Sequence, residues 1–556
     1  MIVSNQSKLV IGIALAFSQA AWAVVPPGAG AQMKQAQQAQ TPNQEQLPPE
    51  IRIETTGVNA SNADDQTQVY VKAVQITGQT VFTAAKLLEV TGFKPNSTLT
   101  LADLRAMAAR ITSFYNDRGY FVANAYLPAQ DISNGVVTIV VSEGRYGKII
   151  VNNKSKLTNS IPNAILGNLE SGAPITIAPV ESSLLLLSDV PGVQVKSTLV
   201  PGTTAGTSDL IVDIESDRLL SGEIDADNGG NRYTGENRFG ATLNLNNALG
   251  FGDVTSLRVM STFEGLDYAR GAYQMQFGKA TAGVAYSWLE YELGKEFSYL
   301  QANGSARIAS VFASYPLQRS RLTNHNVMIG YDDKRYIDRI DAVGLVTRKN
   351  SQVAMAGLYG DHRDSFGGGG YNAYSLVLSA GNLDILTPEA LALDQLTART
   401  DGSFGKLVFS AGRLQNVTEN FALFAGINGQ FASKNLDVSE KMQLGGMYGV
   451  RAYPEGEAYG DEGVLATLEA RLQIPGTLGR MNAVGFVDAG TITLNKNPWG
   501  PGDNHRNLSA AGVGLTWSER DNFSARVYYA WKLGDEPTLS APDADGRLWV
   551  QLVKYF

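Results

Sequence analysis

The chain has 556 residues, with 53 acidic and 45 basic side chains, a net charge of −8 and no cysteine. An acidic balance argues against nucleic acid as a partner. The absence of cysteine excludes disulfides, thiolate nucleophiles and cysteine metal sites, and three scattered histidines do not suggest a zinc centre: His325, His362 and His505. We therefore expect no metal and no other cofactor.

The first 23 residues have the pattern of a secretory signal peptide. Lys8 precedes an apolar run from Leu9 to Phe17, and Ala21-Trp22-Ala23 is an A-x-A cleavage site. The run is too short to span a bilayer as a helix, although a buried helix of a soluble domain is an alternative. No later stretch reaches the roughly 18 apolar residues of a membrane helix. We expect the mature chain to begin near Val24 in the periplasm.

Residues 24–68 are rich in Gln, Ala, Pro and Asn, as in the run from Gln35 to Gln40 and at Pro48-Pro49. Such a segment buries too little apolar surface to offset the entropy of ordering it, so we predict a linker. Ala31 to Ala39 could form a short helix if something held it, and this is the candidate for a plug helix.

Residues 69–145 form the first of two predicted α+β modules. Thr100 before Leu101, with Asp103 close behind, is a plausible cap for the second helix. The periodicity predicts strand, helix, helix, strand, strand, at Val69–Ile76, Thr83–Val90, Leu101–Asn116, Gly119–Leu127 and Val136–Val141.

Residues 146–217 repeat this order and form the second module. Its predicted elements are Lys148–Val151, Ile161–Leu169, Ile177–Leu187, Val193–Leu199 and Asp209–Ile214.

Residues 218–556 lose the helical periodicity and show sixteen short alternating segments. An even number of strands is typical of a single-chain transmembrane β-barrel of the bacterial outer membrane. Such barrels have short periplasmic turns and longer outer loops, and the predicted connections mostly follow this rule. Two do not: Glu264 to Leu266 is short for an outer loop, and Asp361 to Gly370 is long for a turn.

The predicted strands present one apolar face and one polar face. In the twelfth strand, Arg471 shares its face with Thr467, Glu469 and Gln473, and placing such an arginine in lipid would cost on the order of 2–4 kcal/mol. This face therefore points to the lumen. The last strand, Arg547 to Phe556, has an outer set of Leu548, Val550, Leu552 and Phe556 with Lys554 as the exception. A soluble two-sheet sandwich would also alternate, and it is the alternative fold.

A sixteen-stranded barrel encloses an aqueous channel, which some part of the chain must fill when the channel is idle. The longest loop, Ala432 to Gly463, is the best candidate. It contains Arg451, and the thirteenth strand contains Asp488. These two residues could form a charge-assisted hydrogen bond that holds the loop inside the barrel. The alternative is a solvated arginine and an aspartate bonded to a neighbouring strand.

Arg451 within Val450-Arg451-Ala452-Tyr453, together with Phe486-Val487-Asp488-Ala489-Gly490, resembles the paired loop-six and strand-thirteen motifs of the outer-membrane assembly and secretion superfamily. In that superfamily the Arg and the Asp join inside the barrel. The family pattern usually has Gly where this chain has Ala452. The resemblance thus implies a loop-six lock of Arg451 and Asp488, supported by Val450, Tyr453, Phe486 and Gly490.

The two modules resemble the POTRA domains of two-partner secretion transporters, the TpsB family. The resemblance rests on Tyr115, Gly119-Tyr120, Leu127-Pro128 and Glu143-Gly144 in the first module, and on Leu187 to Val193, Pro201-Gly202 and Ser208-Asp209-Leu210 in the second. In this family a helix near the mature amino-terminus plugs the pore.

The resemblance implies an outer-membrane transporter that exports one large β-helical exoprotein, such as an adhesin, haemolysin or contact-dependent toxin. The partners would be the amino-terminal secretion domain of that exoprotein and outer-membrane lipid, and we expect a monomer. The alternative function is a barrel-assembly insertase, which usually carries more POTRA modules. We find no G-x-S-x-G nucleophile elbow and no nucleotide-binding loop, so we expect neither an enzyme nor a nucleotide-driven pump.

Overall fold

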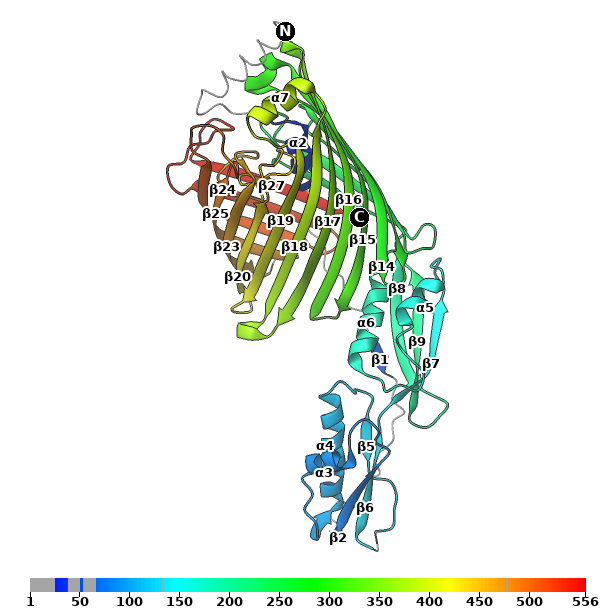
Figure 1. Ribbon diagram of the computed structural model, residues 1–556. Coiled ribbons are helices and arrows are strands. Elements are labelled where there is room, and N and C mark those ends of the chain that lie inside the picture. Colours follow the sequence, from blue (N-terminus) through cyan, green and yellow to red (C-terminus); the bar gives the residue numbers. More distant parts are fainter. Residues whose placement is uncertain (1–25, 39–50, 54–66, 133, 477–478) are drawn as a thin grey trace.

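The computed structural model describes residues 26–38, 51–53, 67–132, 134–476 and 479–556, with only the backbone for 51–53. The predicted signal peptide and most of the predicted linker lie outside these residues. Two small α/β modules follow one another below a barrel (Figure 1). None of the described helices is long and apolar enough to cross a membrane.

Sixteen antiparallel strands close into the barrel, which confirms the predicted fold (Figure 1). They are β10 (Leu220–Asp227), β11 (Arg238–Asn246), β12 (Val254–Ser261), β13 (Leu266–Phe277), β14 (Ala280–Glu292), β15 (Ala302–Arg319), β16 (Thr323–Ile340), β17 (Leu345–Asp364), β18 (Gly370–Ile385), β19 (Gly402–Asn416), β20 (Phe421–Ala432), β23 (Glu462–Ile474), β24 (Arg480–Thr493), β25 (His505–Glu519), β26 (Phe523–Lys532) and β27 (Gly546–Tyr555). The barrel closes by pairing β10 with β27.

Every predicted strand overlaps an observed one, and the largest difference lies in β17, for which the alternation predicts only Arg348–Gly360. Because β17 continues to Asp364, the connection to β18 shrinks to residues 365–369 and is an ordinary turn. The prediction of a long turn at this position was therefore wrong. The connection between β12 and β13, residues 262–265, remains short on the outer side.

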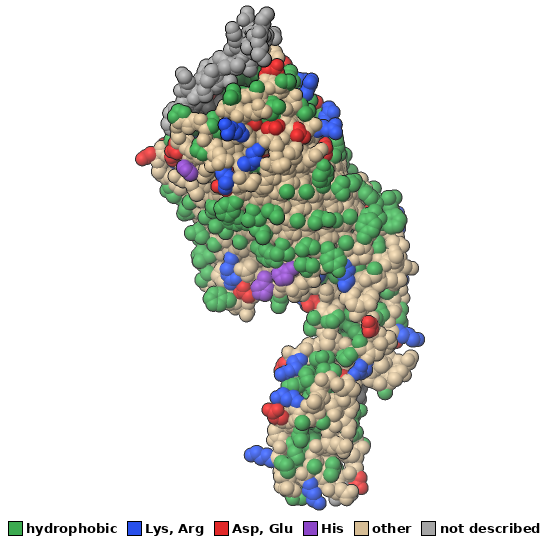
Figure 2. Space-filling view, viewed as in Figure 1, with side chains coloured by type: hydrophobic (Ala, Val, Ile, Leu, Met, Phe, Trp, Pro, Cys, Tyr) green, Lys and Arg blue, Asp and Glu red, His purple; other side chains and the backbone are tan. Residues whose placement is uncertain are grey.

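The outside of the barrel is apolar at mid-height. Leu468 and Leu472 of β23 are more than half exposed, whereas Glu469 between them is buried on the lumen side. Figure 2 shows the hydrophobic side chains as a band across the visible face of the barrel, with most of the charged side chains above and below it. In β27, Leu548 and Leu552 face outward and Trp549 is buried. This alternation is what a lipid-embedded wall requires.

The first module packs two helices on a three-stranded sheet. Helix α4 (Leu101–Asn116) begins with a capping box, in which the Asp103 amide donates to Thr100 Oγ1 over 3.1 Å. The predicted first strand is in fact two, β2 (Gln68–Val71) and β3 (Ala73–Thr77), and the predicted strand Gly119–Leu127 is reduced to β5. The other elements are α3 (Ala84–Thr91), β4 (Ser97–Thr100), β5 (Asn124–Tyr126) and β6 (Val136–Ser142).

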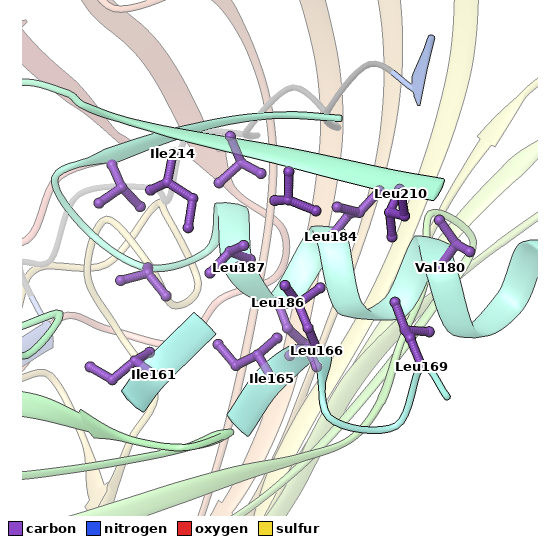
Figure 3. Packing of buried hydrophobic residues seen from close by; sticks show 14 of the residues in the cluster. Ile161, Ile165, Leu166, Leu169, Val180, Leu184, Leu186, Leu187, Leu210 and Ile214 are labelled. Carbon is purple, nitrogen blue, oxygen red and sulfur yellow. The ribbon is translucent and has the colours of Figure 1, made fainter. Parts of the chain in front are cut away.

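The second module packs α5 (Ser160–Leu166) and α6 (Ile177–Ser188) against a sheet in the order β1-β8-β9-β7. Its strands are β1 (Ile51–Ile53), β7 (Arg145–Asn153), β8 (Val193–Pro201) and β9 (Thr207–Ser216). Figure 3 shows the core, where Leu184 and Leu187 of α6 lie between Ile165 of α5 and the sheet residues Leu210 and Ile214. Strand β1 comes from the predicted linker, and it pairs with β8 in parallel.

A buried carboxylate, Glu143, fixes the end of the first module where the second begins. It accepts hydrogen bonds from the amides of Thr80 (2.6 Å) and Val81 (2.7 Å) and from the Tyr115 hydroxyl (2.9 Å). Burial alone would raise the pKa of Glu143, but these hydrogen bonds outweigh it and hold the pKa below its usual value. Arg145 continues the connection by donating to the Gly172 carbonyl over 2.7 Å.

An ion pair joins the second module to the barrel. Asp189 at the end of α6 accepts two hydrogen bonds from Arg319 at the end of β15, at 2.7 and 2.8 Å. A two-pronged Arg–carboxylate pair fixes relative orientation as well as distance. The second module is therefore held against the turn between β15 and β16.

Candidate functional site

Loop six connects β20 to β23 (residues 433–461) and folds back into the barrel. It contains a short ribbon of β21 (Met442–Gln443) and β22 (Tyr459–Gly460). Its apolar side chains are buried against the inner wall, in one cluster made of Met442, Leu444, Val450, Ala452, Tyr453, Ala458, Leu465, Val484, Phe486, Ile492, Leu508, Ala510 and Ala530. Loop six is thus packed as a core inside the lumen.

Arg451 and Asp488 lie in direct contact at the centre of this cluster. Arg451 Nε donates to Asp488 Oδ2 over 2.7 Å and Nη2 donates to Oδ1 over 2.8 Å, while the Arg451 amide donates to Oδ2 over 3.2 Å. Arg451 is 5% exposed and Asp488 is 0% exposed. A buried, bidentate pair is much stronger than a surface pair, and losing either partner leaves an uncompensated buried charge.

A second carboxylate, Glu469, completes the charge balance around Arg451. Arg451 Nη1 donates to Glu469 Oε1 over 2.9 Å, and Arg471 donates to Glu469 Oε2 over 2.7 Å. The Arg451 guanidinium also lies 3.4 Å from the centre of the Phe486 ring, a cation–π contact. Asp488, Glu469 and Phe486 of the inner wall therefore contact Arg451 directly. Arg471 supports this arrangement through its hydrogen bond to Glu469.

The supporting residues expected from the motif all lie here. Val450 and Tyr453 are fully buried, and the Tyr453 hydroxyl donates to the Glu536 carbonyl over 3.1 Å. Gly490 leaves room for loop six, since an added Cβ would lie 2.4 Å from Leu444 Cδ1. Ala452, which stands where the family pattern has glycine, is buried, and it is not among the described residues with a positive φ.

Two functional contacts were not predicted. The alternation puts Glu469 on the lumen face but does not pair it with Arg451, and it leaves Trp549 on the side of the last strand opposite to the outer set without giving it a partner. The Trp549 indole donates to the Arg451 carbonyl over 2.6 Å. A buried indole N–H needs an acceptor, and an inward tryptophan in the last strand was the available signal.

Further ion pairs attach the first part of loop six to the upper barrel wall. Glu440 contacts Lys334 (2.8 Å) and Lys406 (2.6 Å), and Asp437 contacts Lys349 (2.7 Å). Both carboxylates are buried, so buried ion pairs hold this part of loop six as well as the Arg451 region.

Helix α2 (Ala29–Gln38) lies inside the barrel beside loop six (Figure 1). Ala29, Met33 and Ala36 belong to a buried cluster with barrel residues that include Leu289 and Tyr336. The helix starts two residues before the predicted segment Ala31–Ala39. As the prediction required, other parts of the chain hold this helix: it packs against the inner wall formed by β14, β15 and β16.

Mostly uncharged groups hold helix α2. Gln35 Nε2 donates to the Tyr459 hydroxyl over 2.5 Å, and Thr234 Oγ1 donates to Gln32 Oε1 over 3.1 Å. The Ala29 amide donates to Asp338 Oδ1 over 2.7 Å. Lys34, the helix's one charged side chain, donates to the Lys441 carbonyl. The helix thus rests on both the wall and loop six.

Residues 206–517 match the family model of the haemolysin secretion/activation protein ShlB/FhaC/HecB, and residues 69–144 match the ShlB-type POTRA domain model. The chain belongs to this family. The predicted identity as a TpsB transporter with POTRA modules and a barrel is therefore confirmed.

Relatives agree with this assignment. The heme/hemopexin transporter protein HuxB of Haemophilus influenzae is 28% identical over 473 residues, 82% of each chain. The outer membrane transporter CdiB of Dickeya dadantii is 23% identical over 462 residues, 80% of this chain and 79% of CdiB. The structure of CdiB from Escherichia coli is similar in fold, with a TM-score of 0.70 and 19% identity over 96% of this chain and 100% of that one.

Membership fixes the cellular place and the general activity of the chain. It is an outer-membrane transporter of two-partner secretion, with its two modules in the periplasm and its barrel in the membrane, and it exports a partner exoprotein. The predicted location and the predicted general function are confirmed.

Proposed function

We propose that this transporter exports a large β-helical exoprotein, an adhesin, haemolysin or contact-dependent toxin, which it recognises by the exoprotein's amino-terminal secretion domain. In this proposal the unfolded secretion domain is captured in the periplasm by strand addition to the modules. Backbone pairing tolerates many client sequences, so one site can capture successive segments of a long chain. The transporter acts as a monomer and carries out no catalysis.

Loop six is the gate of this export path. The observation that carries this part of the proposal is the buried pair of Arg451 with Asp488, which ties an outer loop to the inner wall of β24. With loop six and helix α2 both inside the barrel, an extended polypeptide finds little free cross-section. Export therefore requires helix α2 to leave and loop six to shift.

Direction comes from outside the cell. The sequence has no G-x-x-x-x-G-K-[ST] loop for a nucleotide, so folding of the β-helix on the far side would prevent back-sliding. A β-helix adds one coil after another, and each folded coil is too wide to re-enter the barrel.

Depletion of the transporter tests the proposed function. We expect one large secreted protein to disappear from the culture medium while the amounts of other outer-membrane barrels stay unchanged. A general loss of outer-membrane barrels would instead favour an insertase and overturn export as the primary function. Expressing the wild-type transporter again should return secretion to normal.

A further inference from the structure

Four exposed arginines lie on the neighbouring barrel strands β15, β16 and β17. These residues form the outer arginine patch: Arg307, Arg335, Arg339 and Arg348. Within the described ranges of the chain, only the side chain of Arg335 has an ion-pair or hydrogen-bond partner in this group. That partner is Asp333, whose Oδ1 lies 3.2 Å from Arg335 Nε. The patch is therefore a largely uncompensated group of positive charges.

The patch lies on the outer side of the barrel wall, because the residues next to it in sequence face the lumen. Lys334 and Lys349 hold carboxylates of loop six at 2.8 and 2.7 Å. Asp338 accepts a hydrogen bond from the first turn of helix α2, and Ile308 is buried in the cluster that contains this helix. Successive side chains of a strand point to opposite faces, so each neighbouring arginine points away from the lumen.

The patch also lies directly above the apolar band, on the side away from the periplasm. The turn between β15 and β16 contacts the second module, so the opposite ends of these strands are the outer ends. Going toward those ends, the last large apolar side chains of the outer face are Val311 on β15 and Tyr331 on β16, both exposed. Arg307 and Arg335 follow four residues further along each strand, about 13 Å away. In Figure 2 basic side chains lie just above the band.

Two members of the patch, Arg307 and Arg335, are register partners on adjacent strands. Side chains in this position have Cβ atoms about 4.5–5.5 Å apart, and like charges there repel each other. Asp333 offsets little of this repulsion, because its pair with Arg335 is open to solvent. A phosphate between the two guanidinium groups could accept hydrogen bonds from both. A bound anion would thus turn a repulsive pair into an attractive site.

The surroundings of this pair favour a lipid. Trp288 of β14 is the register partner of Arg307 on its other side, and tryptophan is enriched at the interface between membrane and water. Exposed carboxylates follow on the two flanking strands, Glu290 on β14 and Asp384 on β18. The positive charge is therefore confined to three strands, and the apolar band begins directly below it.

We propose that Arg307 and Arg335 form a binding site for a phosphate group of a lipid in the outer leaflet. The phosphate lies between the two guanidinium groups, and the acyl chains lie along the apolar band beside Val311 and Tyr331. A lipid fits this site better than a free anion, because one molecule contacts both the arginines and the apolar surface below them. The other two arginines of the patch add to the attraction of anionic lipid.

Lipid binding by the purified transporter in a neutral detergent tests the site. The probe is diphosphorylated lipid A, and native mass spectrometry measures its dissociation constant. We expect Arg307→Gln with Arg335→Gln to weaken binding at least fivefold. The matched control is Arg520→Gln with Lys554→Gln, which removes two exposed positive charges at the periplasmic end of the barrel. The control should bind within twofold of the wild type, and equal binding by the arginine variant would overturn the proposal.

Two further probes identify the ligand on the wild-type protein and need no variant. Lipid A from which both phosphates have been removed should bind at least fivefold more weakly. Equal binding of the two lipids would overturn the role of the phosphate. Inorganic phosphate should not displace the bound lipid, and its displacement of the lipid would overturn the assignment of the site to a lipid.

Discussion

Loop six and helix α2 both fill the lumen, but they are held by different forces. Loop six is bonded through buried charges, with Arg451 between Asp488 and Glu469. Helix α2 is held mainly by apolar side chains and by a few hydrogen bonds that involve its Gln side chains, Lys34 and its first turn. A buried charge pair is costly to break, whereas neutral contacts can be exchanged for water at little cost. This difference supports the proposed mechanism, in which helix α2 leaves the lumen and loop six stays attached while it shifts.

Arg451→Ala should have the largest effect. It leaves Asp488 and Glu469 buried without their shared partner, which costs about 3–5 kcal/mol at this site. We expect the barrel still to assemble, seen as a heat-modifiable band on a gel, but secretion to fall more than tenfold and channel currents to become irregular. Asp488→Ala should behave in the same way.

Arg413→Ala is the matched control for this prediction. It removes an arginine that contacts Asp364 over 2.7 Å near the periplasmic turn between β17 and β18, and whose other hydrogen bonds go to Asn372 and Gln415 rather than to loop six. We expect its secretion to stay within twofold of the wild type. Wild-type secretion by the two lock variants would remove the Arg451–Asp488 pair from the mechanism.

Deleting residues 29–38 removes helix α2 and should open the channel without unfolding the barrel. The helix contributes part of one apolar cluster, whereas the sixteen-stranded ladder is independent of it. We expect a several-fold higher mean conductance in planar bilayers and an unchanged melting transition of the barrel within a few degrees. Conductance equal to that of the wild type would show that loop six alone closes the lumen.

Gly30→Val should displace helix α2 by overpacking. A Cβ at this position would lie 2.5 Å from Ser439 Cβ of loop six, and a strain of about 1–3 kcal/mol would favour the state with the helix outside. We expect more frequent channel openings in bilayer recordings. Gly271→Val is the matched control, because a Cβ there meets no atom within 4 Å, and it should leave the recordings unchanged.

Tyr459→Phe should have the smallest effect. It removes the hydroxyl that accepts a hydrogen bond from Gln35, which is worth about 0.5–1.5 kcal/mol. We expect a modest rise in open probability, smaller than that of Gly30→Val, with normal secretion. A loss of secretion as large as that of Arg451→Ala would contradict the distinction between the two lumen occupants.

Much of the barrel could be predicted because lipid imposes a strict alternation on each strand. In β23, Leu468 and Leu472 had to face outward once Arg471 was placed in the lumen. The outer ends of β16 and β17 extend above the apolar band, where this constraint ends, so Asp338 and Arg339 carried no strand signal.

The site was only partly predictable, because strand alternation does not show which lumen-facing side chains contact loop six. Arg451 and Asp488 stood out by their motifs, but Glu469 and Trp549 act through register and loop geometry that spacing does not reveal. Helix α2 lacks an apolar stripe, because aromatic and polar side chains of the inner wall surround it. Strand β1 is three residues long, below the length at which alternation can be recognised.

The hydrogen bond from Trp549 to the Arg451 carbonyl has a consequence for biogenesis. Trp549 is carried by β27, which pairs with β10 over five residues, from Glu223↔Tyr555 to Asp227↔Gln551, whereas β16 and β17 pair over eighteen. Strand β27, the last of the barrel, must therefore be in place before the Arg451 carbonyl can accept this hydrogen bond. Loop six therefore has its full set of contacts only once the last strand of the barrel is in place.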